Sequence, residues 1–380
     1  MEDRLKLYLK TMEAHNGSDL HIKAGSGVRA RINGELKVLG KEYMTNEQVF
    51  DLIKAITTDK ELEKLRKTGY TDFGYTPNSK SRYRVNAFSQ MEGYSLVMRV
   101  IPTDIPTIEE LKLPDIIHSF TDIPRGLVLV TGVTGSGKST TLAAMLNSIN
   151  NKYQKHIITL EDPVEFVHKD NKCLINQRAK GTDFEEFADA LPAALREDPD
   201  VILVGEMRDI ETIELALHAA NTGHLVFSTL HTLDAKETVN RIIGSFQKEE
   251  QNRIRLSLAS VISGIVSQRL VPTVAGGRAA AVEVMVQTSR VKELIRDNRD
   301  VEIFDAIEEG KDIYGSQTFD QHLLEMADEG VITTDTALEY ATSPSDLKLK
   351  FEGVGRSSTQ NKNQEGGTAG LDAFDFKEED

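Results

Sequence analysis

Short apolar runs alternate with longer amphipathic stretches between residues 115 and 350. The runs cover residues 126–131, 156–160, 201–205 and 224–230. They lack the polar alternation of a half-exposed strand, so we expect strands that are buried on both faces. Residues 183–197 and 209–223, which lie between the runs, have helical apolar spacing. This alternation predicts an α/β domain in which helices cover both faces of a parallel sheet.

The remainder of this region, roughly residues 246–350, has the apolar spacing of helices. We expect helices over residues 251–270, 289–298 and 318–330. Beyond them, residues 353–380 lose the apolar period and gain Gly, Ser, Gln and Asn, which predicts a disordered tail. The expected second domain therefore spans residues 115–352.

Residues 1–101 have the pattern of a smaller α+β domain. An amphipathic helix opens the chain, and two alternating runs joined by Asn33-Gly34 predict a hairpin. Residues 44–69 have one continuous helical period with Thr45 as its N-cap. Residues 81–90 and 94–101 are expected to form two strands that pair around Met91-Glu92. The prolines of residues 102–114 then predict a linker.

Composition narrows the class of protein. The chain has 380 residues and a formal net charge of −15, which opposes non-specific binding to nucleic acid. Its single cysteine, Cys173, excludes an intrachain disulfide and a zinc site built from several cysteines. The charged N-terminus is not a secretory signal, and no window of 18 apolar residues occurs. We therefore expect a cytoplasmic protein, or one that docks from the cytoplasmic side.

The first apolar run leads into a phosphate-binding motif. Residues 132–139 read GVTGSGKS, which matches G-x-x-x-x-G-K-[ST] between a predicted strand and a predicted helix. Backbone N–H groups of such a loop surround phosphate oxygens, and the helix N-terminus adds its positive dipole end. Lys138 is expected to reach the β- and γ-phosphates of ATP, and the Ser139 hydroxyl to hold Mg²⁺. The residues expected to bind the nucleotide are Gly132, Thr134, Gly135, Ser136, Gly137, Lys138, Ser139 and Thr140.

Polar residues stand at the ends of the other buried runs. Hydrolysis of a γ-phosphate needs a carboxylate that orients or deprotonates water. Glu206 is the best candidate for that base, and Glu165 for a second carboxylate on the water or the metal. His224 and His231 bracket the last run and are further candidates. Gly205 stands where many P-loop enzymes carry a metal-binding aspartate, so metal contact there must be weak or water-mediated.

Two arginines of the smaller domain are candidates for arginine fingers. If residues 81–90 and 94–101 pair around Met91-Glu92, Arg84 and Arg99 face each other. Like charges in directly opposed positions destabilise a strand pair, and an anion between them would remove that cost. We expect the anion to be a γ-phosphate, bound either by the same chain or by a neighbour in a ring. The alternative is that both arginines extend into solvent.

Four segments resemble the Walker A, Asp box, Walker B and His box of the type II/type IV secretion ATPases, in particular the PilT-type ATPases that retract type IV pili. They are GVTGSGKSTT, ITLEDPVEFVH, ALREDPDVILVGEMRD and TGHLVFSTLHT. GSDLHIKAGSGVRARINGEL and YRVNAF, both in the first domain, extend the resemblance.

The resemblance implies a PAS-like first domain, a RecA-like ATPase core and a hexameric ring. It also implies a motor for twitching motility at the cytoplasmic face of the inner membrane, where a pilus platform protein and a sister pilus ATPase would be partners. Carried over by motif, Glu206 is the catalytic glutamate, Glu165 belongs to the Asp box, and His224 and His231 belong to the His box. Arg84 and Arg99 match the arginines of the first domain.

Some segments depart from the family pattern. Residues 244–247 read GSFQ in place of a phenylalanine-proline turn, and Lys292 of SRVKELIRD stands where the retraction motif has arginine. These departures leave three alternatives open beside retraction. They are an accessory ring subunit, an extension or secretion ATPase, and a nucleic-acid translocase. The single cysteine argues against the extension ATPases with their four-cysteine motif, and the acidic charge argues against the translocase.

Overall fold

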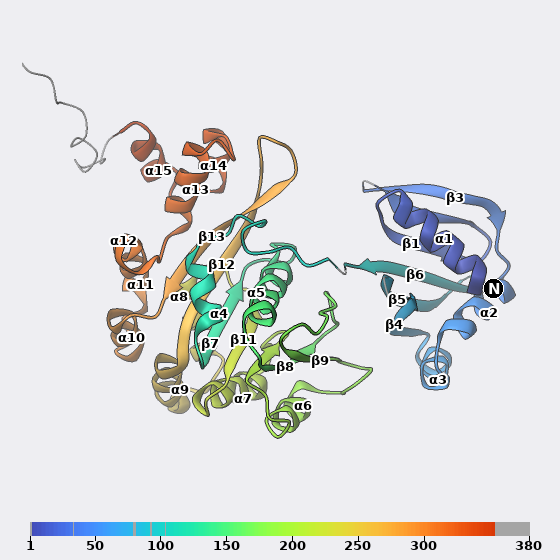
Figure 1. Ribbon diagram of the computed structural model, residues 1–380, viewed down its shortest axis with the longest axis horizontal. Coiled ribbons are helices and arrows are strands. Elements are labelled where there is room, and N and C mark those ends of the chain that lie inside the picture. The colour runs from blue at the N-terminus through green and yellow to red at the C-terminus, as the bar shows by residue number, and fades with distance from the viewer. Residues whose placement is uncertain (1, 33, 79–80, 92, 103, 354–380) are drawn as a thin grey trace, which may run out of the picture.

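The computed structural model describes residues 2–32, 34–78, 81–91, 93–102 and 104–353, which form two separate units (Figure 1). The expected turn residues Asn33 and Glu92, and the expected tail beyond Gly353, lie outside the described residues. Within the described part of the chain, no helix is long and apolar enough to cross a membrane.

The first unit is a six-stranded antiparallel sheet with three helices on one face. Its elements are α1 (Glu2–Ala14), β1 (Gly17–Lys23), β2 (Gly27–Ile32), β3 (Glu35–Tyr43), α2 (Asn46–Ile56), α3 (Asp59–Thr68), β4 (Tyr70–Asn78), β5 (Ser81–Gln90) and β6 (Gly93–Ile101). The strand order is β3-β2-β1-β6-β5-β4. Alternate strand residues such as Leu20, Val85 and Met98 form one core with the apolar faces of the helices, including Leu5 and Leu52.

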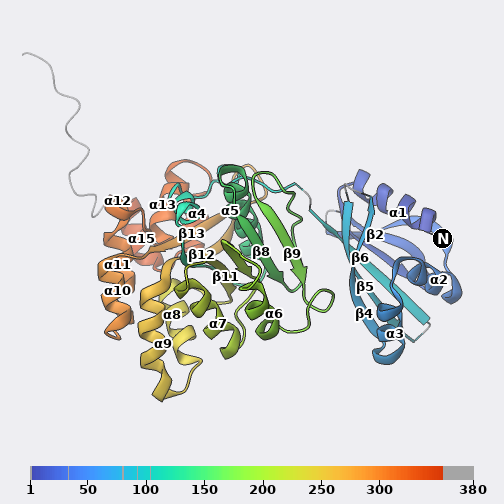
Figure 2. The same cartoon turned by 60° about the horizontal axis from the view of Figure 1, so that its bottom comes forward.

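Among the described residues, no helix covers the other face of this sheet, where charged side chains alternate along the strands with the buried ones. Arg84 on β5 lies directly opposite Arg99 on β6, which confirms the expected hairpin register. Figure 2 shows α1 and α2 on the far side of the sheet from the second unit. The connecting chain leaves β6 at Ile101, and Ile108 and Leu113 are already buried in the core of the second unit.

The second unit is a seven-stranded sheet between two layers of helices. Its strands are β7 (Gly126–Thr131), β8 (His156–Glu161), β9 (Leu174–Ala179), β10 (Val201–Val204), β11 (Leu225–Leu230), β12 (Ile262–Pro272) and β13 (Arg278–Val286). The order is β13-β12-β7-β11-β10-β8-β9, with every neighbouring pair parallel except β12 and β13. The α/β architecture expected from the apolar runs is confirmed.

Helices cover both faces of this sheet, and a group of C-terminal helices lies beside β13 (Figure 1). Val128 and Val130 of β7 contact the core formed with α4 and α5, whereas Leu127 and Leu129 contact the core formed with α6 to α9. The helices are α4 (Ile116–Asp122), α5 (Lys138–Lys152), α6 (Phe187–Ala194), α7 (Ile210–Asn221), α8 (Ala235–Gly244), α9 (Lys248–Val261), α10 (Ser289–Arg296), η1 (Asp300–Glu302), α11 (Ile303–Glu309), α12 (Lys311–Tyr314), α13 (Phe319–Asp328), α14 (Thr334–Tyr340) and α15 (Pro344–Phe351).

Three helical predictions were wrong in extent. Residues 251–270 are not one helix, because α9 ends at Val261 and β12 begins at Ile262, where it adds to the edge of β7. Residues 44–69 form two helices, because Thr58 begins a second capping box with Glu61 directly after α2. The helix expected over residues 183–197 begins only at Phe187, since residues 180–186 form turns and a bridge.

Candidate active site

The glycine-rich loop joins β7 to α5 at the carboxyl edge of the parallel strands, as expected. Gly132, Gly135 and Gly137 have φ values of 138°, 79° and 92°, a region that favours glycine. A Cβ on Gly132 would lie 2.4 Å from the carbonyl oxygen of Gln268. The loop can therefore make this turn only without a side chain there. The Lys138 ammonium donates to the carbonyl oxygens of Gly132 (2.8 Å) and Val133 (3.1 Å).

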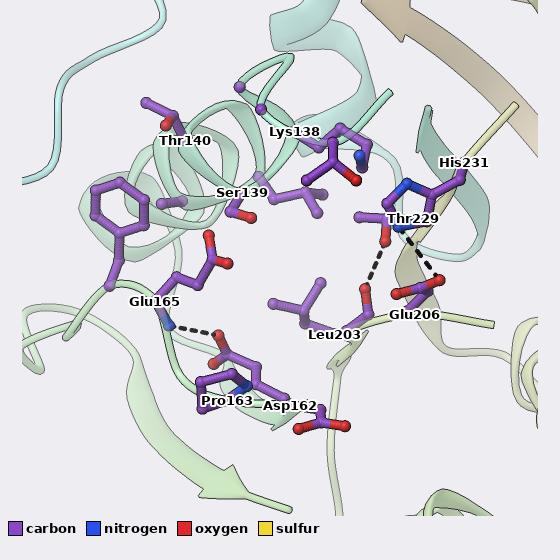
Figure 3. Close-up of a pocket in the computed structure, with 18 of the residues that line it drawn as sticks. Lys138, Ser139, Thr140, Asp162, Pro163, Glu165, Leu203, Glu206, Thr229 and His231 are labelled. Atoms are coloured by element: carbon purple, nitrogen blue, oxygen red, sulfur yellow. Dashed lines mark hydrogen bonds and ion pairs between the residues drawn. The ribbon is translucent and has the colours of Figure 1, made fainter. Parts of the chain in front are cut away.

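A cavity of about 600 Å³ lies beyond this loop (Figure 3). It brings together most of the residues that the sequence singled out. Those that line it are Thr134, Gly135, Gly137, Lys138, Ser139, Thr140, Glu165, Glu206 and His231. Gly132 and Ser136 belong to the turn beneath, where the buried Ser136 hydroxyl has no hydrogen-bond partner among the described residues. Burial lowers the pKa of Lys138, while the charges of Glu206 and Glu165 partly oppose that shift.

Glu206, two residues beyond the end of β10, lies between the side chains of Arg208 and His231. Arg208 Nη2 lies 2.8 Å from Glu206 Oε2, and His231 Nε2 lies 3.4 Å from Oε1. Burial alone would raise the pKa of Glu206, but Arg208 and His231 together hold it below its ordinary value. The carboxylate is therefore ionised at neutral pH, as a base toward water must be. Sequence reasoning missed Arg208, although it follows Glu206 by only two residues.

Glu165 belongs to a loop that a second, unexpected carboxyl group organises. Glu161, the last residue of β8, accepts hydrogen bonds from Thr159 Oγ1 (2.6 Å), Gln177 Nε2 (3.2 Å) and the backbone N–H of Glu165 (3.4 Å). Burial raises the pKa of Glu161, and these hydrogen bonds partly oppose the shift. In Figure 3 the Glu165 carboxylate points toward the Ser139 hydroxyl.

The close contact between β10 and the end of β8 explains Gly205. A Cβ on Gly205 would lie 3.1 Å from the carbonyl oxygen of Leu160 and 3.2 Å from Glu161 Cα. The Gly205 N–H donates to Leu160 (2.7 Å), and the Gly205 carbonyl oxygen accepts from Thr229 Oγ1 (2.7 Å). A side chain at position 205 would require Leu160 and Glu161 to move by a few tenths of an ångström. Close packing therefore disfavours the metal-binding carboxylate common in other P-loop enzymes.

Besides Gly132 and Ser136, three further candidate residues do not line the cavity. His224 precedes β11, and its Nδ1 lies 3.0 Å from the carbonyl oxygen of Ala219. Because β11 is six residues long, His224 is separated from His231 by about 20 Å of chain, and the chain does not bring both histidines into one site. Arg84 and Arg99 lie on the first unit. Arg99 Nε already donates to Asp19 Oδ1 (2.8 Å), a partner that the sequence did not predict.

The comparison with protein families shows which class of P-loop protein carries this site. The type II/IV secretion system protein family matches residues 2–339. The chain belongs to this family.

Relatives within the family include pilus ATPases. The type IV pilus retraction ATPase PilT of Pseudomonas aeruginosa is 45% identical over 327 residues, which cover 86% of this chain and 95% of that protein. The type IV pilus ATPase PilU of the same organism is 37% identical over 345 residues, 90% of each chain. A crystal structure of the pilus retraction motor PilT with bound ADP superposes with a TM-score of 0.84, at 40% identity, covering 90% of this chain and 98% of that one. The resemblance to PilT-type ATPases is confirmed.

A second cavity of about 560 Å³ adjoins the phosphate-binding loop of this family member. Gly137, Thr140, Leu270 and Arg278 line both cavities, so the two cavities adjoin each other. Further walls of the second cavity come from the connecting segment, through Glu110 and Lys112. No sequence motif marks it, because its walls join segments more than 150 residues apart.

Proposed function

We propose that this protein is a hexameric ATPase motor that drives retraction of type IV pili from the cytoplasmic face of the inner membrane. One observation carries the proposal. The P-loop, Glu165 and Glu206 meet at one cavity, in a chain that matches a retraction ATPase over 95% of that ATPase's length. The inner-membrane pilus platform protein is the proposed partner, and no nucleic acid is required.

ATP fits the two adjoining cavities. Its phosphates would lie against the loop N–H groups and Lys138, and the adenine and ribose would extend past Gly137 and Thr140 into the second cavity. Glu206 would accept the proton of the attacking water.

Mg²⁺ is part of the proposal. No group of three or more His, Cys, Asp or Glu that could hold a metal occurs in the described ranges. Ser139 and Glu165 fit an ion that keeps several water ligands and is otherwise held by phosphate oxygens. Such an ion would neutralise charge on the phosphates.

Arg84 and Arg99 are proposed to act as fingers on the nucleotide of a neighbouring subunit. They project from the face of the first unit that carries no helix, and no residue of the first unit lines the chain's own nucleotide cavity. An arginine finger contributes about 10³–10⁵ in turnover in other phosphoryl-transfer enzymes. Arg84→Ala should therefore reduce hydrolysis severely and leave ADP affinity unchanged, because ADP lacks the γ-phosphate.

Mixed rings test whether the fingers act between subunits. Arg84→Ala chains keep Glu206, and Glu206→Gln chains keep Arg84. In a mixed ring, the Arg84 of a Glu206→Gln chain would serve the intact site of its Arg84→Ala neighbour. An excess of Glu206→Gln chains should therefore raise the ATPase activity measured per Arg84→Ala chain. Rings shown to be mixed by mass photometry but without restored activity would assign the arginines to their own chain's site.

A strain that lacks only this protein tests the motor assignment. Loss of twitching together with longer surface pili, restored by the wild-type chain and not by Lys138→Ala, is the expected result. The match to PilU favours one second candidate, an accessory ring subunit. In that case Lys138→Ala would restore twitching while a sister ATPase is present. Unchanged twitching and pilus length in the deletion strain would contradict both assignments.

A further inference from the structure

Four charged residues form a single row across the helix-free face of the first unit. Asp19 on β1 lies opposite Arg31 on β2 and also opposite Arg99 on β6, and Arg99 lies opposite Arg84 on β5. Residues in directly opposed positions share one face of a sheet, so all four side chains leave the same side. The one carboxylate of this row thus stands between two of its three arginines.

Asp19 contacts only the Nε side of the Arg99 guanidinium. Arg99 Nε donates to Asp19 Oδ1 at 2.8 Å, and the Ser18 hydroxyl donates to Oδ2 at 2.7 Å. Asp19 is 4% exposed, whereas the Arg99 side chain is 67% exposed. The Nη1 and Nη2 groups of Arg99 have no partner among the described residues. The carboxylate therefore fixes the base of the side chain and leaves its two-nitrogen end available.

Stability alone does not account for a buried carboxylate at this position. Asp19 also pairs with Arg31, whose Nε lies 4.0 Å from Oδ2. Both arginines are exposed to solvent, and ion pairs with exposed arginines contribute little to folding, while burial of a charge carries a desolvation cost. Burial would raise the pKa of Asp19, but the hydrogen bonds from Ser18 and Arg99 hold it below its ordinary value, so the group stays anionic. A buried, ionised carboxylate can instead fix the orientation of a functional cation. Carboxylates that hydrogen-bond to metal-binding histidines act in this way.

We propose that Asp19 is a positioning residue for Arg99, and that it presents the Nη1 and Nη2 edge of the guanidinium to the γ-phosphate bound by a neighbouring subunit. This inference rests on the proposed function, because it needs the arginine finger. Arg84 forms no ion pair with any described residue, so the two fingers differ. Arg99 is held before the ring closes, and Arg84 is ordered only by contact with the phosphate.

A double-mutant cycle on the full chain tests this role. Asp19→Asn and Asp19→Ala should lower kcat by about 10- to 100-fold, the usual effect of losing an orienting partner, with unchanged ADP affinity. In the Arg99→Ala background, the Asp19 substitutions should have no further effect on kcat, since the residue they orient is gone. Asp72→Asn is the matched control. Asp72 is an exposed aspartate on the same sheet face that accepts a hydrogen bond from Asn86 (3.0 Å), and its loss should leave kcat within about twofold of wild type.

The outcomes separate this inference from the finger itself. Full ATPase activity of Arg99→Ala would contradict both the finger role of Arg99 and the positioning role of Asp19. Loss of activity in Arg99→Ala with near-normal kcat in Asp19→Asn would overturn the role of Asp19 and leave the finger intact. Equal fold losses from Asp19→Ala with and without Arg99 would show that Asp19 acts elsewhere, which also overturns it. If Asp19→Asn, which preserves side-chain size, unfolds at assay temperature by circular dichroism, Asp19 is structural and the inference is wrong.

Discussion

Glu283 should make the second unit less stable as the pH rises toward neutrality. It lies on β13 opposite Ser267, is almost completely buried, and accepts the backbone N–H of Ala235, the first residue of α8 (2.8 Å). Burial raises its pKa to about 7, and the negative charges of Asp234 and Asp320 add to the effect of burial. The Ala235 hydrogen bond and the charge of Arg269 oppose it.

The sign follows from proton binding. Below an ordinary carboxyl pKa of 4.5, Glu283 is neutral in both the folded and the unfolded chain. Between that value and about 7 the unfolded chain releases the proton while the folded chain keeps it, so the free energy of unfolding falls as pH rises. Above pH 7 both forms are ionised and the loss is complete. Each tenfold change in proton affinity is worth about 1.4 kcal/mol, so the full loss is about 3 kcal/mol.

Glu283→Gln should remove this loss. The glutamine keeps the side-chain size and can still accept the Ala235 N–H, but it cannot ionise. The substitution itself adds a difference in free energy of unfolding that does not change with pH. Beyond that constant difference, the free energy of unfolding of Glu283→Gln should exceed that of wild type by about 2 kcal/mol at pH 6 and about 3 kcal/mol at pH 8. Urea unfolding of both proteins across this range measures it, with the exposed Glu249→Gln as control. Parallel stability curves for wild type and Glu283→Gln would refute the assigned pKa.

Two further predictions concern the nucleotide site. Glu206→Gln should lower the rate of ATP hydrolysis by about 10²–10⁴-fold and retain nucleotide binding, because only the base is neutralised. Lys138→Ala should abolish nucleotide binding measured by calorimetry. The reverse pattern would contradict both assigned roles. Arg208→Ala should raise the pKa of Glu206, because Arg208 is the largest influence that lowers it. The acid limb of the pH profile of kcat should then move to higher pH, and an unmoved limb would show that Glu206 does not set it.

Local sequence was sufficient to predict the part of the site built on the parallel strands. Residues 127–130 are apolar without alternation because both faces of β7 are covered, and the loop after β7 needs glycine at three positions with positive φ. β12 could not be separated from α9 in the same way. The apolar spacing continues through Val261, and only pairing with β7 and β13 makes Ile262–Pro272 a strand.

Contacts between distant segments account for the rest of what was missed. The partner of Arg99 lies 80 residues earlier in the chain, on a strand that has no special composition. Glu161 was not predicted as a site residue, because its hydrogen-bond partner Gln177 lies on the neighbouring strand β9. The close approach of Leu160 and Glu161 to Gly205 likewise depends on sheet order, which local sequence does not specify.

The cationic residues around the cavity bear on how hydrolysis is coupled to movement in the proposed ring. Besides Lys138, the described lining includes Arg278, Arg208, which is paired with Glu206, and Lys180, which is paired with Glu186. Arg84 and Arg99 from the first unit of a neighbour would add positive charge at the γ-phosphate. As proposed fingers, these arginines would reach a nucleotide only when the first unit lies against it, and ADP would not hold them there. In the proposed ring, loss of the γ-phosphate therefore releases the first unit, and the short connection from Ile101 to the buried Ile108 transmits that release to the second.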